Sequence, residues 1–483
     1  MRLRLSRPLA VLAAAGLAGC MVGPDYHRPA MPLAPAFKEQ GWNPAQPADL
    51  SPRGDWWRLF GDPALAALEG RVAVNNQNVA AAEAAYRQAE ALVSEQRAGL
   101  FPTVSLDAGA TRSGGGRTGG GTVITQGAGG TGIVSGGGGR SSTSYRLSAS
   151  ASWAPDVWGR IRRSIESARG NAQASQADLA AATLSAQASL ATDYFDLREL
   201  DAEAALLREE AADFSQSLKI AQNRYNAGIA PHSDALEAQS QLASTQADLA
   251  DIERRRAAFE HAIAVLTGQT PETFALAAEP TWNPTIPEPP PGVPSQLLQR
   301  RPDVAAAERR AASASAQIGV ETAAYFPALT LTGTYGFTAT ELGKLFSASN
   351  SFWSYGASAA QTLFNGGLTH ARVGAARAGY EQAVAQYRQA VLAALQDVED
   401  QLAASRVLAG EYELRRAAAT DAELAATMVR NQYREGQVDY TSVATAQVSA
   451  LNARRTLLQA ALSRQTTAVS LVQGLGGGWT APF

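Results

Sequence analysis

The chain is poor in the residues on which most small catalytic and metal sites depend. Among its 483 residues there is one cysteine, and there are four histidines. A single cysteine excludes an internal disulfide and a cysteine-rich metal site. None of the histidines has a carboxylate or cysteine at metal-ligand spacing, and no serine-nucleophile motif stands out. We expect no enzymatic activity, no bound metal and no small-molecule cofactor.

Charge of either sign and long apolar runs are also scarce. Charged residues make up 18% of the chain, and the formal net charge is −3. Nucleic-acid binding calls for a basic patch, so no nucleic-acid partner is expected. No run of about 18 uncharged apolar residues follows Cys20. If this part of the chain crosses a membrane, it must do so with strands.

The N-terminus reads as an export signal. Residues 1–19 combine a start containing three arginines, a short apolar stretch at 9–17 and the small-residue string Leu17-Ala18-Gly19. Cys20 follows directly, in a setting that resembles a bacterial lipobox, whose cysteine becomes the lipid-bearing N-terminus. We therefore expect a covalent lipid on Cys20 that anchors the protein to a membrane.

The rest of the chain is written twice. Tyr225-x-x-Gly228 is followed by Gln239, and the same pattern returns 208 residues later as Tyr433-x-x-Gly436 followed by Gln447. Such self-similarity indicates two structural repeats. The expected organisation is a signal peptide at 1–19, a lipid-anchored extended tether at 20–66, a first repeat at 67–270, a Pro-rich linker at 271–294, a second repeat at 295–476 and a tail at 477–483.

Each repeat contains one predicted β-hairpin, at about 102–154 and about 327–363. The segments alternate apolar residues with small hydroxyl residues, and aromatic residues lie near their ends. One strand of this kind also suits a soluble sandwich, but the hydroxyl faces and the aromatic residues together favour a membrane barrel. Four strands cannot enclose an aqueous lumen, so several chains must share one barrel. Three chains would supply twelve strands.

A glycine-rich stretch, 114–139, lies inside the first hairpin. It lacks the Gly-Lys-Ser/Thr string of a phosphate-binding loop, so we interpret it as a long loop in solvent. The predicted fold class is thus a mixed α and β membrane protein, with four strands per chain.

Helical periodicity occupies most of the remainder. A helix is predicted to start at Asp62-Pro63 and to continue to about Gly99. Longer helices are predicted from about 159 to 226 and from about 368 to 434, and each reverses at a short turn into a second helix. Apolar residues stepping by three and four predict coiled-coil packing. The expected architecture is a trimeric barrel that continues into a long helical tunnel.

Several strings resemble the lipoprotein branch of the outer-membrane factor family, the TolC-like channels of tripartite efflux pumps, of which nodulation-T-like lipoproteins are members. They lie in the family's order along essentially the whole chain after Cys20. The strings are Gly23-Pro24-Asp25-Tyr26-x-Arg28-Pro29, Trp56-Trp57-Arg58-Leu59-Phe60-Gly61-Asp62-Pro63, Asp156-Val157-Trp158-Gly159-Arg160 and Arg301-Pro302-Asp303-Val304 with Phe326-Pro327.

The resemblance implies a homotrimer in the bacterial outer membrane, with its helical part in the periplasm. It implies a passive exit duct for drugs and other small molecules. The duct would dock a periplasmic adaptor (membrane fusion) protein and, through it, an inner-membrane transporter of the resistance-nodulation-division (RND) type. Two alternatives remain open at this stage. One is the duct of a type I protein secretion system, and the other is a pore-less, lipid-anchored coiled-coil scaffold of the envelope.

The resemblance also locates the tip of the tunnel. In related channels, rings of aspartate and bulky apolar residues after the second turn close the resting pore. The matching places here carry hydroxyl residues, so an aspartate ring is absent there, and nearby acids are either substitutes or helix caps. The candidate constriction residues are Thr441, Ser442, Thr445, Asp439, Glu237 and Asp234; the candidate adaptor contacts are Tyr225, Gly228, Tyr433 and Gly436.

Overall fold

A computed structural model describes residues 21–31, 38, 55–113, 124–125, 132–133, 142–287 and 301–477. The chain divides into two compact units. Unit 1 comprises Met1–Tyr26, Ala91–Arg169 and Ser313–Tyr380; unit 2 comprises His27–Glu90, Gly170–Ala312 and Glu381–Phe483. Among the described helices, none combines the length and the apolar character needed to cross a bilayer.

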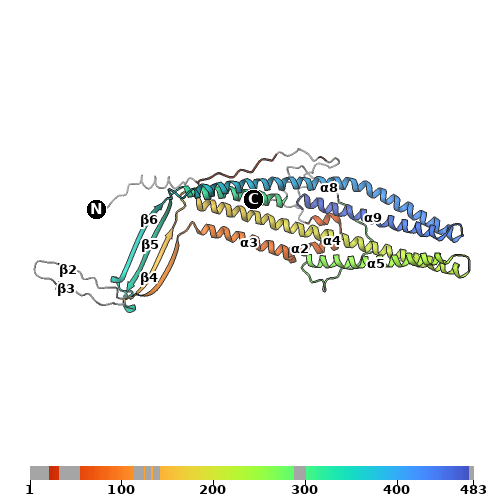
Figure 1. Ribbon diagram of the computed structural model, residues 1–483, viewed down its shortest axis with the longest axis horizontal. Coiled ribbons are helices and arrows are strands. Elements are labelled where there is room, and N and C mark those ends of the chain that lie inside the picture. The colour runs from red at the N-terminus through yellow and green to blue at the C-terminus, as the bar shows by residue number, and fades with distance from the viewer. Residues whose placement is uncertain are drawn as a thin grey trace. The chain divides into compact units, whose positions relative to one another are not determined.

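Unit 1 contains an antiparallel sheet of four strands in the order β1-β4-β5-β6 (Figure 1). The predicted strands are confirmed, with one difference at the end of the last. The last strand was predicted to run to about residue 363, but β6 ends at Ala360. Ala360 pairs with Ala328, the first residue of β5, and Leu363 lies after the strand. The strands are β1 (Thr103–Ser113), β4 (Ser142–Trp153), β5 (Ala328–Ala339) and β6 (Ser351–Ala360).

The register gathers the apolar residues of all four strands on one face of the sheet. Residues directly opposite each other in an antiparallel pair point to the same side. Alternate rows across the sheet therefore share a face. The apolar pattern on this face breaks at Ser351, at the start of β6, and at the pair of Arg112 and Thr143, near the other end of β1 and β4. The rows are Val104–Ala151–Gly333–Tyr355, Leu106–Ala149–Tyr335–Trp353 and Ala108–Leu147–Phe337.

The other face of the sheet carries mainly small hydroxyl side chains, together with Asp107, Arg146 and Phe352. One row there consists of Ser105, Ser150, Thr334 and Ser354, which are serine or threonine on every strand. Alternation along each strand thus becomes two chemically different faces of one sheet. Within the glycine-rich stretch, where a plain loop was predicted, two short strands pair with each other: β2 (Ile124–Thr125) and β3 (Gly132–Ile133).

The prediction of one helix from Pro63 to about Gly99 is wrong in one respect, because the helix is interrupted at Asn76. Helix α2 (Pro63–Asn75) begins as predicted, with Asp62 accepting hydrogen bonds from the amides of its first turn. Asn76 is extended, and its Oδ1 accepts from the backbone N of Asn78 and Val79 at the start of α3 (Gln77–Ala98). Asparagine favours this capping position, and its side-chain nitrogen also donates to the backbone O of Leu266.

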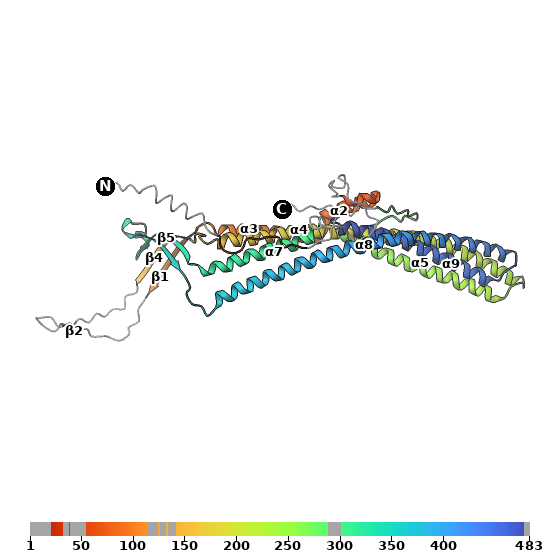
Figure 2. The same ribbon diagram turned by 90° about the horizontal axis from the view of Figure 1, so that it is seen from above.

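The long helices occur in matched pairs. Helices α4 (Arg160–Asn226) and α8 (Leu368–Arg434) have 67 residues each, and α5 (His232–Leu266) and α9 (Tyr440–Gly474) have 35 each. A helix of 67 residues is about 100 Å long. Within unit 2, the turns of both helix pairs lie at the same end (Figure 2). The other helices in the described part of the chain are α7 (Pro302–Thr322) and the short 3₁₀ helices η2 (Trp56–Phe60), η3 (Ala323–Tyr325), η4 (Leu342–Lys344) and η5 (Ala348–Asn350).

The main core of unit 2 forms where the aromatic string before α2 meets the middle of α4. Phe60 and Phe195 pack with ring centroids 5.1 Å apart. The Tyr194 hydroxyl donates to Asp62 Oδ2 over 2.6 Å, so the residue that caps α2 also ties it to α4. Buried residues of this cluster include Trp56, Trp57, Leu65, Leu68, Val72, Leu190, Ile263 and Val469.

Candidate functional site

The two turns at the tip of unit 2 have the same geometry. Gly228 and Gly436 adopt φ of +73° and +77°, a region open to glycine at little cost. In each turn the glycine N donates to the tyrosine three residues earlier, over 2.9 Å to Tyr225 O and 3.0 Å to Tyr433 O. This pattern ends a helix and satisfies its last carbonyls. Both glycines therefore shape the turns, whatever else the turns contact.

The two turn tyrosines differ in their surroundings. Tyr433 is buried, and its ring packs edge-on against Tyr440 at 5.7 Å. Tyr225 is 44% exposed and lies 4.6 Å from the ring of His232. Within one chain, only the tyrosine of the first turn is open to a partner. The same turn exposes Ile229, 68% accessible, which the sequence did not single out.

Two arginines join the helix pairs near the tip. Arg224 Nη1 donates to Tyr433 O over 3.0 Å, and its guanidinium lies 4.7 Å from the centre of the Tyr433 ring. Arg430 of α8 binds Asp213 of α4 over 2.5 Å. Neither arginine was predicted, because each has its partner more than 200 residues away and carries no local motif. Together they hold the two helix pairs against each other.

The candidate constriction residues of the second repeat lie on an exposed part of α9. Thr441, Ser442 and Thr445 are all exposed in the chain, and Thr445 Oγ1 donates to Thr441 O over 2.8 Å. Asp439 is the N-cap of α9, and its Oδ1 accepts from the N and Oγ of Ser442 over 3.0 and 2.6 Å. These hydrogen bonds from Ser442 hold the pKa of Asp439 below its usual range. The capping role that the sequence allowed for this acid is thus present.

The acids of the first repeat lie against the second. Glu237 is half-buried, and its Oε2 accepts from Thr441 Oγ1 over 3.3 Å. Asp234 is also half-buried, in the first turn of α5. Burial, followed by the charges of Glu237, Tyr433 and Asp234, raises the pKa of Tyr440 to about 12. The structure therefore brings Glu237 of α5 into contact with Thr441 of α9. Between the two helix pairs lies an apolar cluster of Ala221, Ala235, Ala238, Tyr433, Tyr440, Val443 and Ala444.

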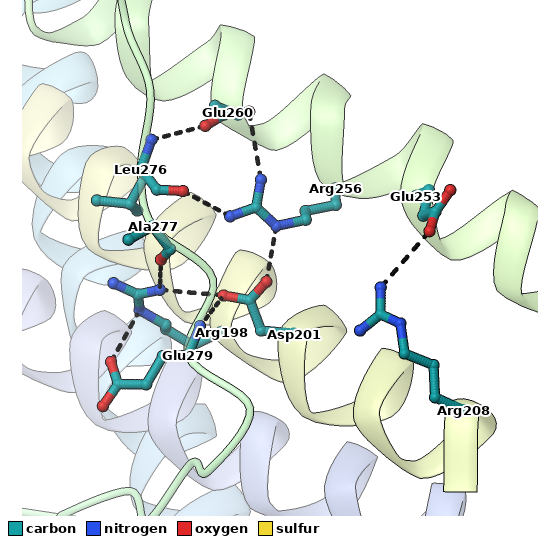
Figure 3. A network of polar contacts seen from close by, with 9 residues as sticks. All are labelled: Arg198, Asp201, Arg208, Glu253, Arg256, Glu260, Leu276, Ala277 and Glu279. Atoms are coloured by element: carbon teal, nitrogen blue, oxygen red, sulfur yellow. Dashed lines mark hydrogen bonds and ion pairs between the residues drawn. The ribbon is translucent and has the colours of Figure 1, made fainter. Parts of the chain in front are cut away.

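A second polar site, missed from the sequence, lies in the middle of α4 (Figure 3). Asp201 is buried, and its two carboxylate oxygens bind Arg256 Nε over 2.7 Å and Arg198 Nη1 over 3.0 Å. It also accepts from the backbone N of Glu279 over 3.0 Å. A buried charge needs such partners to offset its desolvation.

The same network holds the segment after α5. Arg256 Nη2 donates to Leu276 O over 2.7 Å, and Arg198 Nη1 donates to Ala277 O over 2.8 Å (Figure 3). Glu260 accepts from the backbone N of Leu276, again over 2.7 Å. The start of the predicted linker is therefore fixed along α4 and α5 by charged side chains.

Unit 2 also buries an acid without a partner. Glu69 of α2 is fully buried, and neither of its carboxylate oxygens has a hydrogen-bond partner. Burial raises its pKa to about 9, so the side chain is neutral at pH 7. No sequence motif marks this burial, since acidic side chains are almost never fully buried unless they are paired.

Comparison with known proteins decides what kind of molecule this is. Residues 69–269 and 293–477 match the profile of the family described as outer membrane efflux protein. The chain belongs to this family. The predicted resemblance is therefore confirmed, and with it the outer-membrane location and the efflux role.

Individual family members match over nearly their whole length. The cation efflux system protein CusC of Escherichia coli O6:H1 is 26% identical, over 96% of this chain and 97% of its own. The pyoverdine export outer membrane protein OpmQ of Pseudomonas putida is 29% identical, over 94% of each. The solved structure of the outer-membrane channel OprN has a TM-score of 0.83 and 30% identity, covering 95% of this chain and 100% of its own.

These family members confirm the mixed α and β fold with its four-stranded sheet. The family is one of efflux proteins, and its description names no enzymatic reaction. Residues 1–20, and with them Cys20 and the expected signal peptide, lie outside the described residues. So do residues 32–37 and 39–54 of the tether, most of the glycine-rich stretch, and residues 288–300, which span the end of the predicted linker and the start of the predicted second repeat.

Proposed function

We propose that three copies of this chain close one barrel of twelve strands, through which the exported substrate leaves the cell. The observation that carries this proposal is the sheet of unit 1, which has one apolar face and one hydroxyl face. Among the described strands, its outer members β1 and β6 each have a neighbour on one side only. Hydrocarbon does not tolerate open strand edges, and pairing β1 of one copy with β6 of the next removes them.

Two structural repeats explain why one chain supplies two hairpins. Each hairpin, β1–β4 and β5–β6, is followed by a helix of 67 residues and then one of 35. The match of the family profile to two separate stretches supports the same duplication. In the trimer, six such repeats would surround one axis, with the helices continuing the lumen of the barrel as a tunnel.

The channel serves as a passive duct for drugs and other small molecules. An inner-membrane RND transporter supplies the energy, and a periplasmic adaptor protein connects it to the tip of the tunnel. The named substrates of CusC and OpmQ, a cation and pyoverdine, differ in chemistry, so family membership leaves the cargo of this chain open. The exposed residues of the first turn, Tyr225, Gly228 and Ile229, would contact the adaptor together with the turn at Gly436.

At the tip, hydroxyl groups rather than a ring of charges would line the constriction. Thr441, Ser442 and Thr445 are exposed in the single chain, whereas the nearby acids are engaged in a cap or against the other repeat. The resting pore would then be sealed mainly by helix packing. The lipid on Cys20 would anchor each copy in the outer membrane.

Deleting the gene tests the proposed transport. A deletion strain should become more susceptible to several compounds in a panel of antibiotics, dyes and bile salts, and the gene on a plasmid should restore resistance. Unchanged susceptibility to the whole panel would contradict the proposal.

The adaptor contact has its own test. Ile229→Asp places a charge on the exposed first turn and should lower resistance without lowering the amount of trimer. Val265→Asp is the matched control, because Val265 is a similarly exposed residue at the other end of α5. Loss of trimer with Ile229→Asp, or equal loss of resistance with both variants, would count against a contact at the turn.

A further inference from the structure

The apolar face of the sheet is hollowed near its centre. The hollow is an open groove whose floor is formed by Ala151 and Gly333. Tyr335, Trp353 and Tyr355 stand along one side, and Val104 lies on the other. A Cβ atom added to Gly333 would meet nothing within 4 Å, so the space above this residue is empty.

The walls of the groove are ordered by contacts between aromatic rings. Trp353 and Tyr355 stack with their planes only 4° apart and their centroids separated by 5.5 Å. Both are largely exposed, at 68% and 82%, as is Val104 at 74%. None of the residues that line the groove is charged. An uncharged trough of this kind suits a linear apolar ligand, and the acyl chain of a lipid is such a ligand.

Residues 22–25, close to the N-terminus, are bound within unit 1 by hydrogen bonds. Val22 N donates to Trp158 O over 3.2 Å, just after β4. Arg163 is 1% exposed, and it donates to Val22 O, Gly23 O and Asp25 Oδ1 over 3.2, 3.2 and 2.9 Å. The first described residues of the chain are thus fixed by a buried arginine.

Close backbone packing fixes this segment further. Gly23 has φ of +98°, and a Cβ on it would come within 2.4 Å of Gly319 Cα. A Cβ on Gly159 would come within 2.6 Å of Met21 Cγ. Met21 therefore packs directly against Gly159, and Cys20 is the next residue toward the N-terminus.

The contact between Met21 and Gly159 lies close to the start of β5, from which the groove can be reached along the strand. Trp158 Nε1 donates to Pro327 O over 2.8 Å, and the Trp158 ring stacks on Phe326 at 4.8 Å. Val22, which donates to Trp158 O, is therefore beside the start of β5. Gly333 is six residues after Pro327, about 20 Å along the strand. One leaflet of the hydrocarbon core is about 15 Å thick, so an acyl chain has about that length. Cys20 adds up to about 4 Å beyond Met21, so the end of the acyl chain extends about 19 Å, just to the edge of the groove at Gly333.

We propose that the end of an acyl chain carried by Cys20 lies in the groove above Ala151 and Gly333, so that the lipid anchor is also a packed part of the barrel wall. This inference rests on the proposed lipidation of Cys20. Because Cys20 is attached beside β5, its acyl chain always reaches the same place on the sheet. A free phospholipid has no such fixed attachment. Each copy in the outer membrane would then carry its own lipid along its own strands.

Photocrosslinking in cells tests the inference. Cells are fed a fatty acid with a photoreactive group near its end, which enters the lipid on Cys20, and the irradiated protein is digested and mapped by mass spectrometry. We expect the N-terminal peptide that starts at Cys20 to be joined to peptides of β5 and β6 that contain Gly333 or Trp353. Gly333→Leu fills the empty space and should lower this yield several-fold. Ala108→Leu, on the same face but away from the groove, should leave it unchanged.

Each other outcome has a distinct meaning. Groove peptides that carry a free labelled phospholipid, without the N-terminal peptide, would show that bulk lipid occupies the groove and would overturn the inference. Crosslinks from Cys20 scattered over the whole apolar face would overturn it as well, while leaving lipidation intact. Absence of label on the N-terminal peptide would refute lipidation and this inference together. The amount of trimer is measured for every variant, and Ala151→Leu provides a second way to fill the groove.

Discussion

Thr441 donates a hydrogen bond to Glu237 over 3.3 Å and so joins α9 of the second repeat to α5 of the first. Glu237 is also the residue that Thr445 matches at the spacing of 208 between the copies. The helix pair α4–α5 therefore has an acid where the pair α8–α9 has a hydroxyl, and α9 supplies the donor for that acid. Glu237, the residue at which the two helix pairs differ, is thus also a point of contact between them.

Because the exposed residues of α9 at the tip are hydroxyls, divalent cations should block the pore weakly. In single-channel recordings, Mg²⁺ added on the side of the helical tip should reduce conductance only slightly. Thr445→Glu would give the second copy the acid of the first, placing three new carboxylates in the trimer, and should produce several-fold stronger block. Ser463→Glu, farther along α9, is the control. Strong block of the unaltered protein would contradict an uncharged constriction.

Removing Arg224 should loosen the tip. Its guanidinium donates to Tyr433 O and lies over the Tyr433 ring, a contact of about 1 to 2 kcal/mol when partly desolvated. We expect Arg224→Ala to speed hydrogen exchange of the amides in both turns, at 225–230 and 433–437. Arg208→Ala removes an exposed pair with Glu253 and serves as the control. Unchanged exchange in the second turn would show that Arg224 does not hold it.

The buried charge network should dominate local stability in unit 2. Asp201→Asn leaves Arg198 and Arg256 without their shared carboxylate, and breaking a buried pair costs about 3 to 5 kcal/mol. Glu253→Gln disrupts an exposed pair in the same region (Figure 3), worth less than about 1 kcal/mol. Thermal unfolding of the two variants in detergent measures the difference. Equal melting temperatures would contradict the assigned role of Asp201.

Glu69 should make stability depend on pH. Its pKa is about 9 in the folded protein and 4.5 ordinarily, so between these values the folded chain holds a proton that the unfolded chain has released. Stability should therefore be fully present below about pH 4.5 and fall as pH rises toward 9, by up to about 1.4 kcal/mol per pH unit. Glu69→Leu should flatten this slope in unfolding experiments at pH 5, 7 and 9, whereas the exposed control Glu83→Leu should not. Parallel slopes for Glu69→Leu and the unaltered protein would contradict the assignment.

Local pattern predicted the parts of the fold that have a strong period. Alternation of period two located the strands, and helical stepping located α4 and α8 to within a residue or two. The break at Asn76 was missed because apolar periodicity continues on both sides of it. A single capping side chain decides that break, and its partner Leu266 is 190 residues away.

The site was less predictable than the fold for the same reason. Asp201 binds Glu279 across 78 residues, and Arg224 reaches Tyr433 across 209. No local signal marks either pair. Tyr225 and Tyr433 have equivalent positions in their motifs, yet one is exposed and the other buried, because only the second meets Tyr440.

Planar bilayer recording of the purified protein tests the central claim most directly. Detergent-extracted trimers should insert as single conducting units whose ion current flows through one shared lumen. A variant that disrupts β6, such as Trp353→Pro with Ala357→Pro, should lose both trimer and conductance. Folded protein that inserts without conductance, or conductance from isolated single chains, would contradict a pore shared by three copies.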